Sequence, residues 1–149
     1  MKTLVIGSGN LLRSDDGAGI HVIEALRSES PVPGIDLIEA VSGIDIIGAV
    51  QGYKKIIIVD AIQAGGPPGT VYEFSLSELE EAGTFSSHGM DFASLIKLGR
   101  GLYPGQIPDD ITVLAVEAED VMTISDKCTP KVTEAVHKVI EMIKSMIAS

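Results

Sequence analysis

The sequence predicts an α/β protein with an open, mostly parallel sheet. Continuous apolar runs such as 56–59 are typical of strands covered on both faces, and the segments between such runs carry apolar residues at helical spacing. Right-handed crossovers place the first three strands in the order 2-1-3, and the short alternating fourth strand is expected to return antiparallel. We expect strands at 1–6, 35–40, 54–60, 70–74 and 111–116, and helices at 17–27, 44–50, 77–81, 92–98 and from 130 onward.

The segment 7–19, GSGNLLRSDDGAG, joins the first strand to the first helix through glycines and acids. Its glycines begin like a dinucleotide-binding motif. However, Leu12 occupies the place of the third glycine, and two aspartates would repel a pyrophosphate at the positive end of the helix. Ser14 or Asp15 is expected to cap the helix and Asp16 to complement its dipole. One of the two acids is then left to point into a cleft.

The third strand places another acid near this turn. Gly52 ends the second helix, and the strand that follows finishes at Asp60. Strands one and three lie side by side with their helices on opposite faces, so their carboxyl ends flank a topological switch point, where open α/β sheets bind ligands. Gly9, in the tight turn after the first strand, is expected to need a positive φ or to face a close neighbour.

His88 is placed like a functional group, in a polar, glycine-containing loop immediately before a helix. By contrast, His21 and His137 fall on the polar sides of the first and last helices. The last helix begins in a recognisable way, with Thr129 as its cap and Pro130 in its first turn. Among the three histidines, His88 is therefore the candidate ligand.

Composition favours one globular unit spanning 1–149, because 149 residues with 45% hydrophobic content are enough for one sizeable core. The net charge of -10 disfavours nucleic acid and anionic membranes as partners, whereas a cationic peptide would be tolerated. The single cysteine, Cys128, cannot form an internal disulfide, and the first residues lack a cleavable apolar segment. The apolar runs are far shorter than the roughly 20 residues needed to span a bilayer. We therefore expect a cytoplasmic protein.

Asp16, Asp60 and His88 come from three separate loops at one end of the predicted sheet. Two carboxylates within about 4 Å repel by roughly 4 kcal/mol at an effective dielectric near 20, so a site that brings them together favours a cation. Two carboxylates and one imidazole leave positions open for water or substrate, and they suit zinc or nickel better than magnesium. The sequence contains neither G-x-S-x-G nor H-E-x-x-H.

These residues and their order resemble the hydrogenase maturation proteases, the endopeptidases that trim the C-terminal extension of the large subunit of nickel-iron hydrogenases. The resemblance covers nearly the whole chain. It rests on the glycine, asparagine, leucine and acid pattern of 7–19, on Val59-Asp60-Ala61, and on His88 with its following glycine. The stretch 39–45, EAVSGID, replaces the acid followed by Gly-Gly-Thr of many members. In this respect it looks like members that serve coenzyme F420-reducing hydrogenases.

The resemblance implies a three-layer α/β/α sandwich of the phosphorylase/hydrolase-like kind, with a five-stranded mixed sheet. It implies that the metal-contacting and catalytic positions are Asp16, Asp60 and His88. The resemblance further implies that the metal is nickel, recognised in the client, and that zinc or cadmium can substitute for it in vitro. The partner implied is the precursor of the hydrogenase large subunit. We expect the protein itself to be a monomer.

Two other functions stay open at this point. A non-catalytic nickel-binding or docking chaperone would use the same three ligands, and a nucleotide-binding module would use the glycine turn. For the protease, the simplest mechanism is a metal-polarised carbonyl attacked by a water that Asp16 or Asp60 activates. A carboxylate nucleophile is the alternative.

Overall fold

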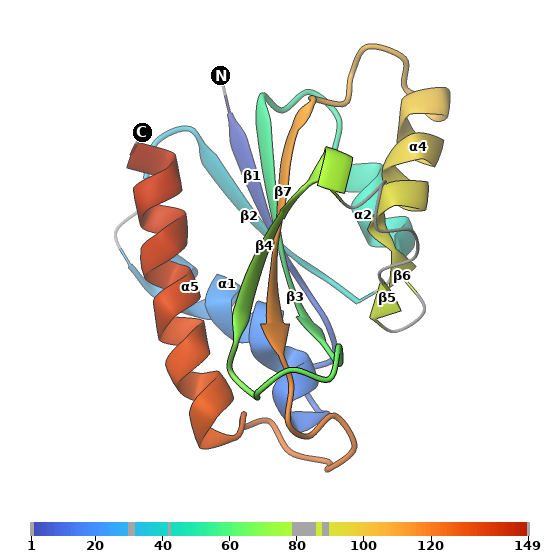
Figure 1. Ribbon diagram of the computed structural model, residues 1–149. Coiled ribbons are helices and arrows are strands. Elements are labelled where there is room, and N and C mark those ends of the chain that lie inside the picture. Colours follow the sequence, from blue (N-terminus) through green and yellow to red (C-terminus); the bar gives the residue numbers. More distant parts are fainter. Residues whose placement is uncertain (1, 30–31, 42, 79–85, 88–89, 149) are drawn as a thin grey trace.

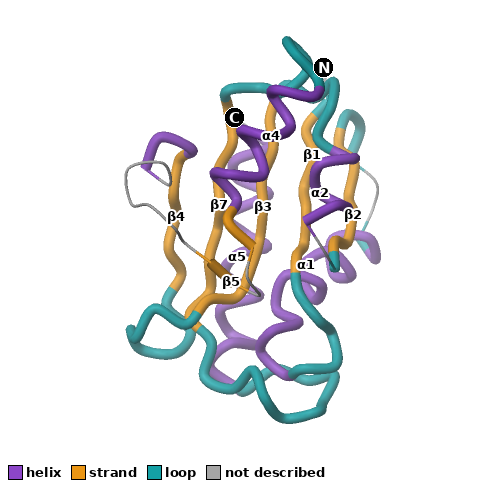
Figure 2. Tube along the Cα trace, turned by 90° about the vertical axis from the view of Figure 1, so that its right-hand side faces the viewer, coloured by secondary structure: helices purple, strands orange, loops and turns teal. Residues whose placement is uncertain are grey.

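The computed structural model describes residues 2–29, 32–41, 43–78, 86–87 and 90–148. Figure 1 shows three layers, with a twisted sheet between α1 and α5 on one face and α2 and α4 on the other. The view turned by 90° places α2 and α4 in front of the sheet (Figure 2). The three-layer α/β/α prediction is confirmed. The helices are α1 (Ala18–Ser28), α2 (Gly43–Ala49), α4 (Phe92–Leu102) and α5 (Pro130–Ala148), and the 3-10 turn η1 (Ser14–Gly17) precedes α1.

The main sheet has five strands in the order β2-β1-β3-β7-β4. Neighbours among the first four pair in parallel, and β4 runs antiparallel to β7, as the sequence predicts. The order β2-β1-β3 confirms the expected crossovers. The strands are β1 (Thr3–Ser8), β2 (Ile35–Ala40), β3 (Lys55–Ile62), β4 (Val71–Ser75) and β7 (Asp110–Glu117). A small separate sheet pairs β5 (Ser86–Ser87) with β6 (Met90–Asp91).

Alternate residues of β3 supply two different hydrophobic cores, because successive side chains of a strand point to opposite faces. Ile56 and Ile58 pack beneath α2 and α4, while Ile57 and Val59 pack beneath α1 and α5. All four side chains are fully buried. Each such burial contributes roughly 1.5–3 kcal/mol, so the central strand is held firmly on both faces.

The third strand is longer than the sequence suggests. We expected it to finish at Asp60, but β3 continues to Ile62. Pairing with β7 persists from Asp60 opposite Ala115 to Ile62 opposite Glu117, and Ala61 and Ile62 are buried. Asp60 therefore lies within a strand that has a neighbour on each side, rather than in the loop after it.

The first helix also begins differently. We expected it at 17, but η1 comes first and α1 starts at Ala18. The backbone of α1 rests directly on the strands, because a Cβ on Gly19 would lie 2.4 Å from the carbonyl oxygen of Val59. Only glycine permits this approach. As a result, η1 is brought to the ends of β1 and β3.

The described residues test two further expectations, the helix at 77–81 and the lack of a segment that could span a bilayer. Residues 76–78 are helical, and the remainder of the helix expected at 77–81 lies outside the described residues. Among the described residues, no helix combines the length and the apolar composition that crossing a bilayer requires.

Candidate functional site

The carboxyl ends of β1 and β3 form the switch point predicted from the sequence. Asp16 lies on η1, which packs against β3, and Asp60 lies near the carboxyl end of β3 itself. Their side chains are 2% and 0% exposed. The structure thus brings together the two elements that carry these acids. The third predicted residue, His88, lies outside the described residues, although the preceding strand β5 also packs against β3.

Asp16 is held by the loop that follows β1. Its Oδ2 accepts a hydrogen bond from the backbone N–H of Asn10 at 3.0 Å, and its own N–H donates to the carbonyl of Arg13 at 3.1 Å. Gly9 has a φ of 143°, and a Cβ there would lie 2.0 Å from the Asp16 carbonyl oxygen. Gly9 therefore has both a positive φ and a close neighbour, either of which was expected to require glycine at this position.

The expected capping of the first helix is wrong. Within the described residues, neither η1 nor α1 receives a capping hydrogen bond from the side chain of its N-cap residue. The Ser14 hydroxyl instead donates to the carbonyl of Lys127, and the Asp15 carboxylate accepts from backbone N–H groups of Glu119 and Asp120. The reason is the 3-10 turn, in which Ser14 adopts a φ of 51°. Both side chains are directed to the loop after β7.

Glu117 is a buried acid that the sequence analysis missed. It ends β7, is 2% exposed, and accepts hydrogen bonds from the N–H groups of Ala64 and Gly66 and from the hydroxyl of Tyr72. The hydrogen bond to Glu117 raises the pKa of Tyr72. The signal was present in the sequence, because Glu117 follows the apolar run 111–116 as Asp60 follows 56–59.

Cys128 is unsuited to act as a nucleophile. Its thiol donates to the carbonyl of Ser14 at 3.8 Å, and desolvation, reinforced by the negative charge of Asp15, raises its pKa to about 11. At neutral pH such a thiol is protonated, and the thiolate is the reactive form. A cysteine hydrolase is therefore disfavoured on geometry and on acidity.

Across the described parts of the chain, no three acid, histidine or cysteine side chains are grouped so that they could hold a metal ion. Those parts include Asp16 and Asp60 but not His88. The set of three ligands therefore remains a prediction. Asp16 and Asp60 supply the oxygen donors of that set, and the imidazole would have to come from the segment between β5 and β6.

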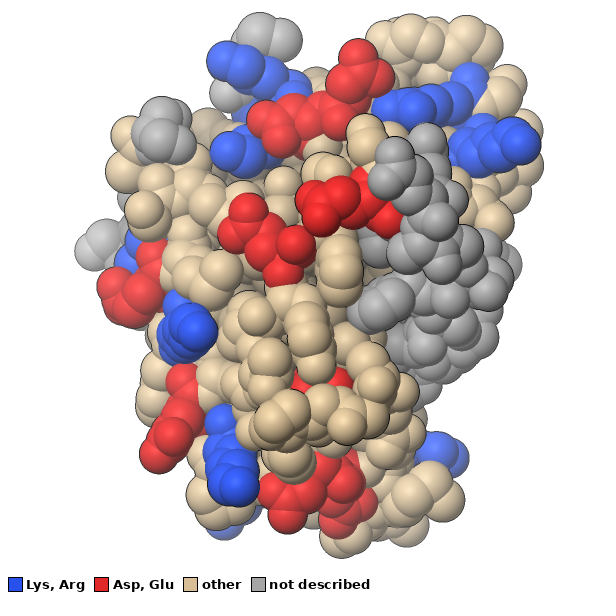
Figure 3. Space-filling model, viewed as in Figure 1, with Lys and Arg blue, Asp and Glu red and all other residues tan. Residues whose placement is uncertain are grey.

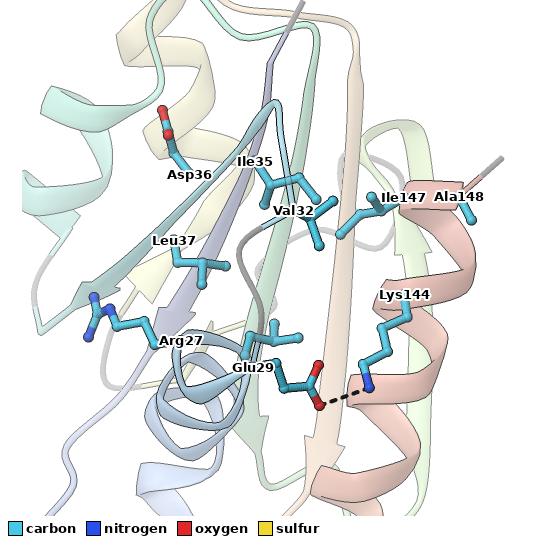
Figure 4. A pocket seen from close by; sticks show the side chains of 10 residues that line it. Arg27, Glu29, Val32, Ile35, Asp36, Leu37, Lys144, Ile147 and Ala148 are labelled. Carbon is cyan, nitrogen blue, oxygen red and sulfur yellow. Dashed lines mark hydrogen bonds and ion pairs between the residues drawn. The ribbon is translucent and has the colours of Figure 1, made fainter.

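A hollow of about 640 Å³ lies between α1, β2 and α5, at the opposite end of the sheet from the switch point. Figure 4 shows its lining, with Lys144 of α5 reaching across to Glu29 at the end of α1. The two side chains form an ion pair at 2.9 Å. The other lining side chains are largely aliphatic, among them Val32, Leu37 and Ile147. This hollow therefore lacks the converging acids of the candidate site.

One group of acidic side chains lies at the lower end of the face shown in Figure 3, the end at which β3 and β7 finish, and others lie across its upper half. The fold and the acids together define an α/β/α protein with an acidic site at the carboxyl edge of its sheet, which suits a cation or general-base chemistry.

Comparison with known proteins identifies the family within this class. The sequence model of the hydrogenase maturation protease family matches residues 20–146, a stretch that contains Asp60 and His88. A protein named as a hydrogenase maturation protease of Methanocaldococcus jannaschii is 30% identical over 147 residues, covering 94% of this chain and 92% of that protein. The chain belongs to the hydrogenase maturation protease family. The resemblance drawn from 7–19, Asp60 and His88 is confirmed.

Two further relatives extend this result. The delta subunit of coenzyme F420 hydrogenase from Methanothermobacter thermautotrophicus is 26% identical over 151 residues, covering 95% of this chain and 92% of that protein. The structure of the hydrogenase maturating endopeptidase HybD from Escherichia coli superposes with a TM-score of 0.83 at 22% identity, covering 99% of this chain and 93% of that one. This last likeness confirms the fold. As a member of the family, the chain is a hydrolase that acts on a hydrogenase precursor.

Proposed function

We propose that this chain removes the C-terminal extension from the large-subunit precursor of a nickel-iron hydrogenase after nickel insertion. The observation that supports this most directly is the packing of η1 against β3, which brings buried Asp16 and Asp60 to one switch point. Membership of the hydrogenase maturation protease family supplies the reaction class. His88 completes the proposed site.

The donor set fits a borderline divalent cation such as nickel, because carboxylate oxygens and an imidazole nitrogen are suitable ligands and leave coordination positions open. In this proposal the nickel is part of the substrate and arrives with the precursor. Zinc or cadmium would substitute in vitro. The N–H of Asn10 fixes one oxygen of Asp16, as outer hydrogen bonds commonly orient ligating carboxylates.

For peptide cleavage, one carboxylate of the pair would take a proton from the attacking water, and the cation would polarise the scissile carbonyl. Burial of Asp16 and Asp60 would strengthen both effects, because electrostatic interactions grow as the local dielectric falls. The proposed roles are therefore general base for Asp16 or Asp60 and metal contact for all three residues.

The test is mass spectrometry of nickel-loaded precursor after incubation with the purified protein. The wild type should remove the extension, while Asp16→Asn, Asp60→Asn and His88→Ala should leave the precursor uncut. The asparagine variants conserve volume, so circular dichroism and melting should show folded proteins. Asp36→Asn, an acid near the amino end of β2, serves as the control and should cleave normally.

The outcomes separate the alternatives. A variant that cleaves at the parental rate would remove its residue from the site. A wild-type protein that binds the precursor but never cuts it would instead be the nickel-binding or docking chaperone. Thermal stabilisation by NAD or ATP, with none by nickel, cadmium or zinc, would favour the nucleotide-binding module.

Cleavage should also depend on nickel in the precursor. Three ligands with open positions bind an ion weakly in the free enzyme, and the ligands around the client's own nickel would complete the coordination. Nickel-free precursor should therefore stay uncut when both proteins have been treated with chelator, and adding nickel to the precursor should restore cleavage. Efficient trimming without nickel would favour an ordinary hydrolytic mechanism.

We further propose that the client is a coenzyme F420-reducing hydrogenase and that the enzyme acts as a cytoplasmic monomer. The form of 39–45 and the similarity to the F420 hydrogenase delta subunit support the client. Processing of an F420-reducing hydrogenase precursor should be faster than processing of a precursor from another hydrogenase class. Light scattering after size exclusion would test the monomer, and equal rates on both precursors would refute the client assignment.

A further inference from the structure

Asp15 and Asp16 are neighbours in sequence, yet their carboxylates serve different parts of the molecule. Asp16 accepts from Asn10, in the loop after β1. Asp15 is fully buried and accepts hydrogen bonds from four donors on the far side of the chain. These donors are the N–H groups of Glu119 (2.8 Å), Asp120 (2.9 Å) and Thr129 (2.7 Å), and the Thr129 hydroxyl (2.8 and 3.0 Å).

The loop at 118–129 is joined to the turn by the backbone as well. The N–H of Asp15 donates to the carbonyl of Asp120, the N–H of Ser14 to the carbonyl of Ser125, and the N–H of Ser125 to the carbonyl of Leu12, all at 2.9 or 3.0 Å. Arg13 and Ser125 form a parallel bridge. The turn that carries Asp16 is thus fixed largely by residues more than 100 positions away in sequence.

A four-residue 3-10 turn has little stability of its own, because its hydrogen bonds are poorly aligned and few. Hydrogen bonds to a carboxylate are shorter and stronger than neutral ones, and buried donors that lose such an acceptor are costly. Both oxygens of Asp15 are engaged by these donors, which occupies the acceptor capacity that a metal ligand would need.

We infer that Asp15 is a positioning residue, which together with Thr129 holds η1 against the loop after β7 and so sets the place of Asp16. The inference deepens the proposed function and rests on it. A displacement of about 1 Å in a reacting group costs on the order of 10²-fold in rate. Loss of the Asp15 contacts should therefore slow the chemical step rather than weaken docking of the precursor.

The experiment compares Asp15→Asn, Thr129→Val and Thr129→Ser on nickel-loaded precursor, well below their melting temperatures. Asp15→Asn should lower kcat by about 10²-fold with KM within twofold of the wild type. Thr129→Val should lower kcat less, and Thr129→Ser, which keeps the hydroxyl, should restore it. Glu117→Gln is the matched control, since Glu117 is equally buried but holds a different loop, and kcat should stay within threefold.

Amide hydrogen exchange supplies a readout that does not depend on cleavage. The Asn10 N–H, bonded to Asp16, should exchange at least tenfold faster in Asp15→Asn and stay at the wild-type rate in Glu117→Gln. Unchanged exchange, or an unchanged kcat in a folded Asp15→Asn protein, would overturn the inference, as would a rise in KM alone. If Asp15→Asn does not fold, equal kcat for Thr129→Val and Thr129→Ser would overturn it. A wild type that never cuts would overturn the proposed function, while exchange would still decide the role of Asp15.

Discussion

Replacing Gly9 by alanine should both destabilise the fold and displace Asp16. Gly9 has a φ of 143°, which costs a residue with a side chain on the order of 1–3 kcal/mol. The added Cβ would lie 2.0 Å from the Asp16 carbonyl oxygen, so the backbone of η1 must move by roughly 1 Å, and such overpacking costs a further 1–3 kcal/mol or so. Together the loss is about 2–6 kcal/mol, which for a chain of this size lowers Tm by roughly 5–20 °C.

Gly52→Ala is the matched control for this prediction. Gly52 also has a positive φ, 81°, but a Cβ there would meet no described atom within 4 Å. The Gly52→Ala variant should therefore lose only the part of the free energy of unfolding that comes from backbone conformation, about 1 kcal/mol, and it should process the precursor at the full rate. Differential scanning calorimetry and cleavage of nickel-loaded precursor check both variants. Equal Tm values together with equal cleavage rates would refute the claim that the close approach of Gly9 places Asp16.

Two further substitutions test the assignments of other side chains. Cys128→Ala should leave processing unchanged, because the raised pKa of about 11 keeps the thiol protonated at neutral pH; loss of cleavage would return the thiol to the site. Tyr53→Phe removes the 2.6 Å hydrogen bond to Asp36, which raises the pKa of Tyr53 from 10.0 to about 12. This contribution to stability is complete below about pH 10 and is lost as the pH rises towards about 12, so the wild type should lose more stability across that range than the variant, and parallel melting curves would contradict this.

The layers of the fold follow from local pattern and from chirality. The run 56–59 is apolar on both faces, which identifies a central strand, and the fixed hand of the crossovers then orders β2, β1 and β3. Nothing local marks where β3 stops. Its last two residues stay in the sheet because β7 continues beside them, and that pairing joins segments more than 50 residues apart.

The role of Asp15 could not be predicted from the sequence either, because it too depends on contacts between segments that are far apart in the chain. The rules that predict where a helix starts consider only residues within about one turn. They predict that an aspartate at this position caps the helix. Its actual partners, Glu119, Asp120 and Thr129, are 104–114 positions away. Asp60 was found because an acid that directly follows the continuous apolar run 56–59 is itself a local signal. Glu117 carries that same signal and could have been found with it.

The acids at the carboxyl edge fall into two groups: Glu117 and Asp15 have structural roles, and Asp16 and Asp60 belong to the proposed site. The carboxylates of Glu117 and Asp15 accept hydrogen bonds from backbone N–H groups of loops. Glu117 accepts from the loop at 64–66, and Asp15 accepts from the loop at 118–129. The bonds to Glu117 fix the loop that follows β3, and the bonds to Asp15 fix the loop that follows β7 together with η1. With η1 fixed by Asp15, Asp16 can be presented beside Asp60 with little rearrangement, which in the proposed function would lower the cost of binding a cation that is already held by another protein. In the proposed function, the nickel-loaded and nickel-free forms of one precursor would then be distinguished by the ion itself, because a fixed pair of acids can bind a loaded site without any loop having to close.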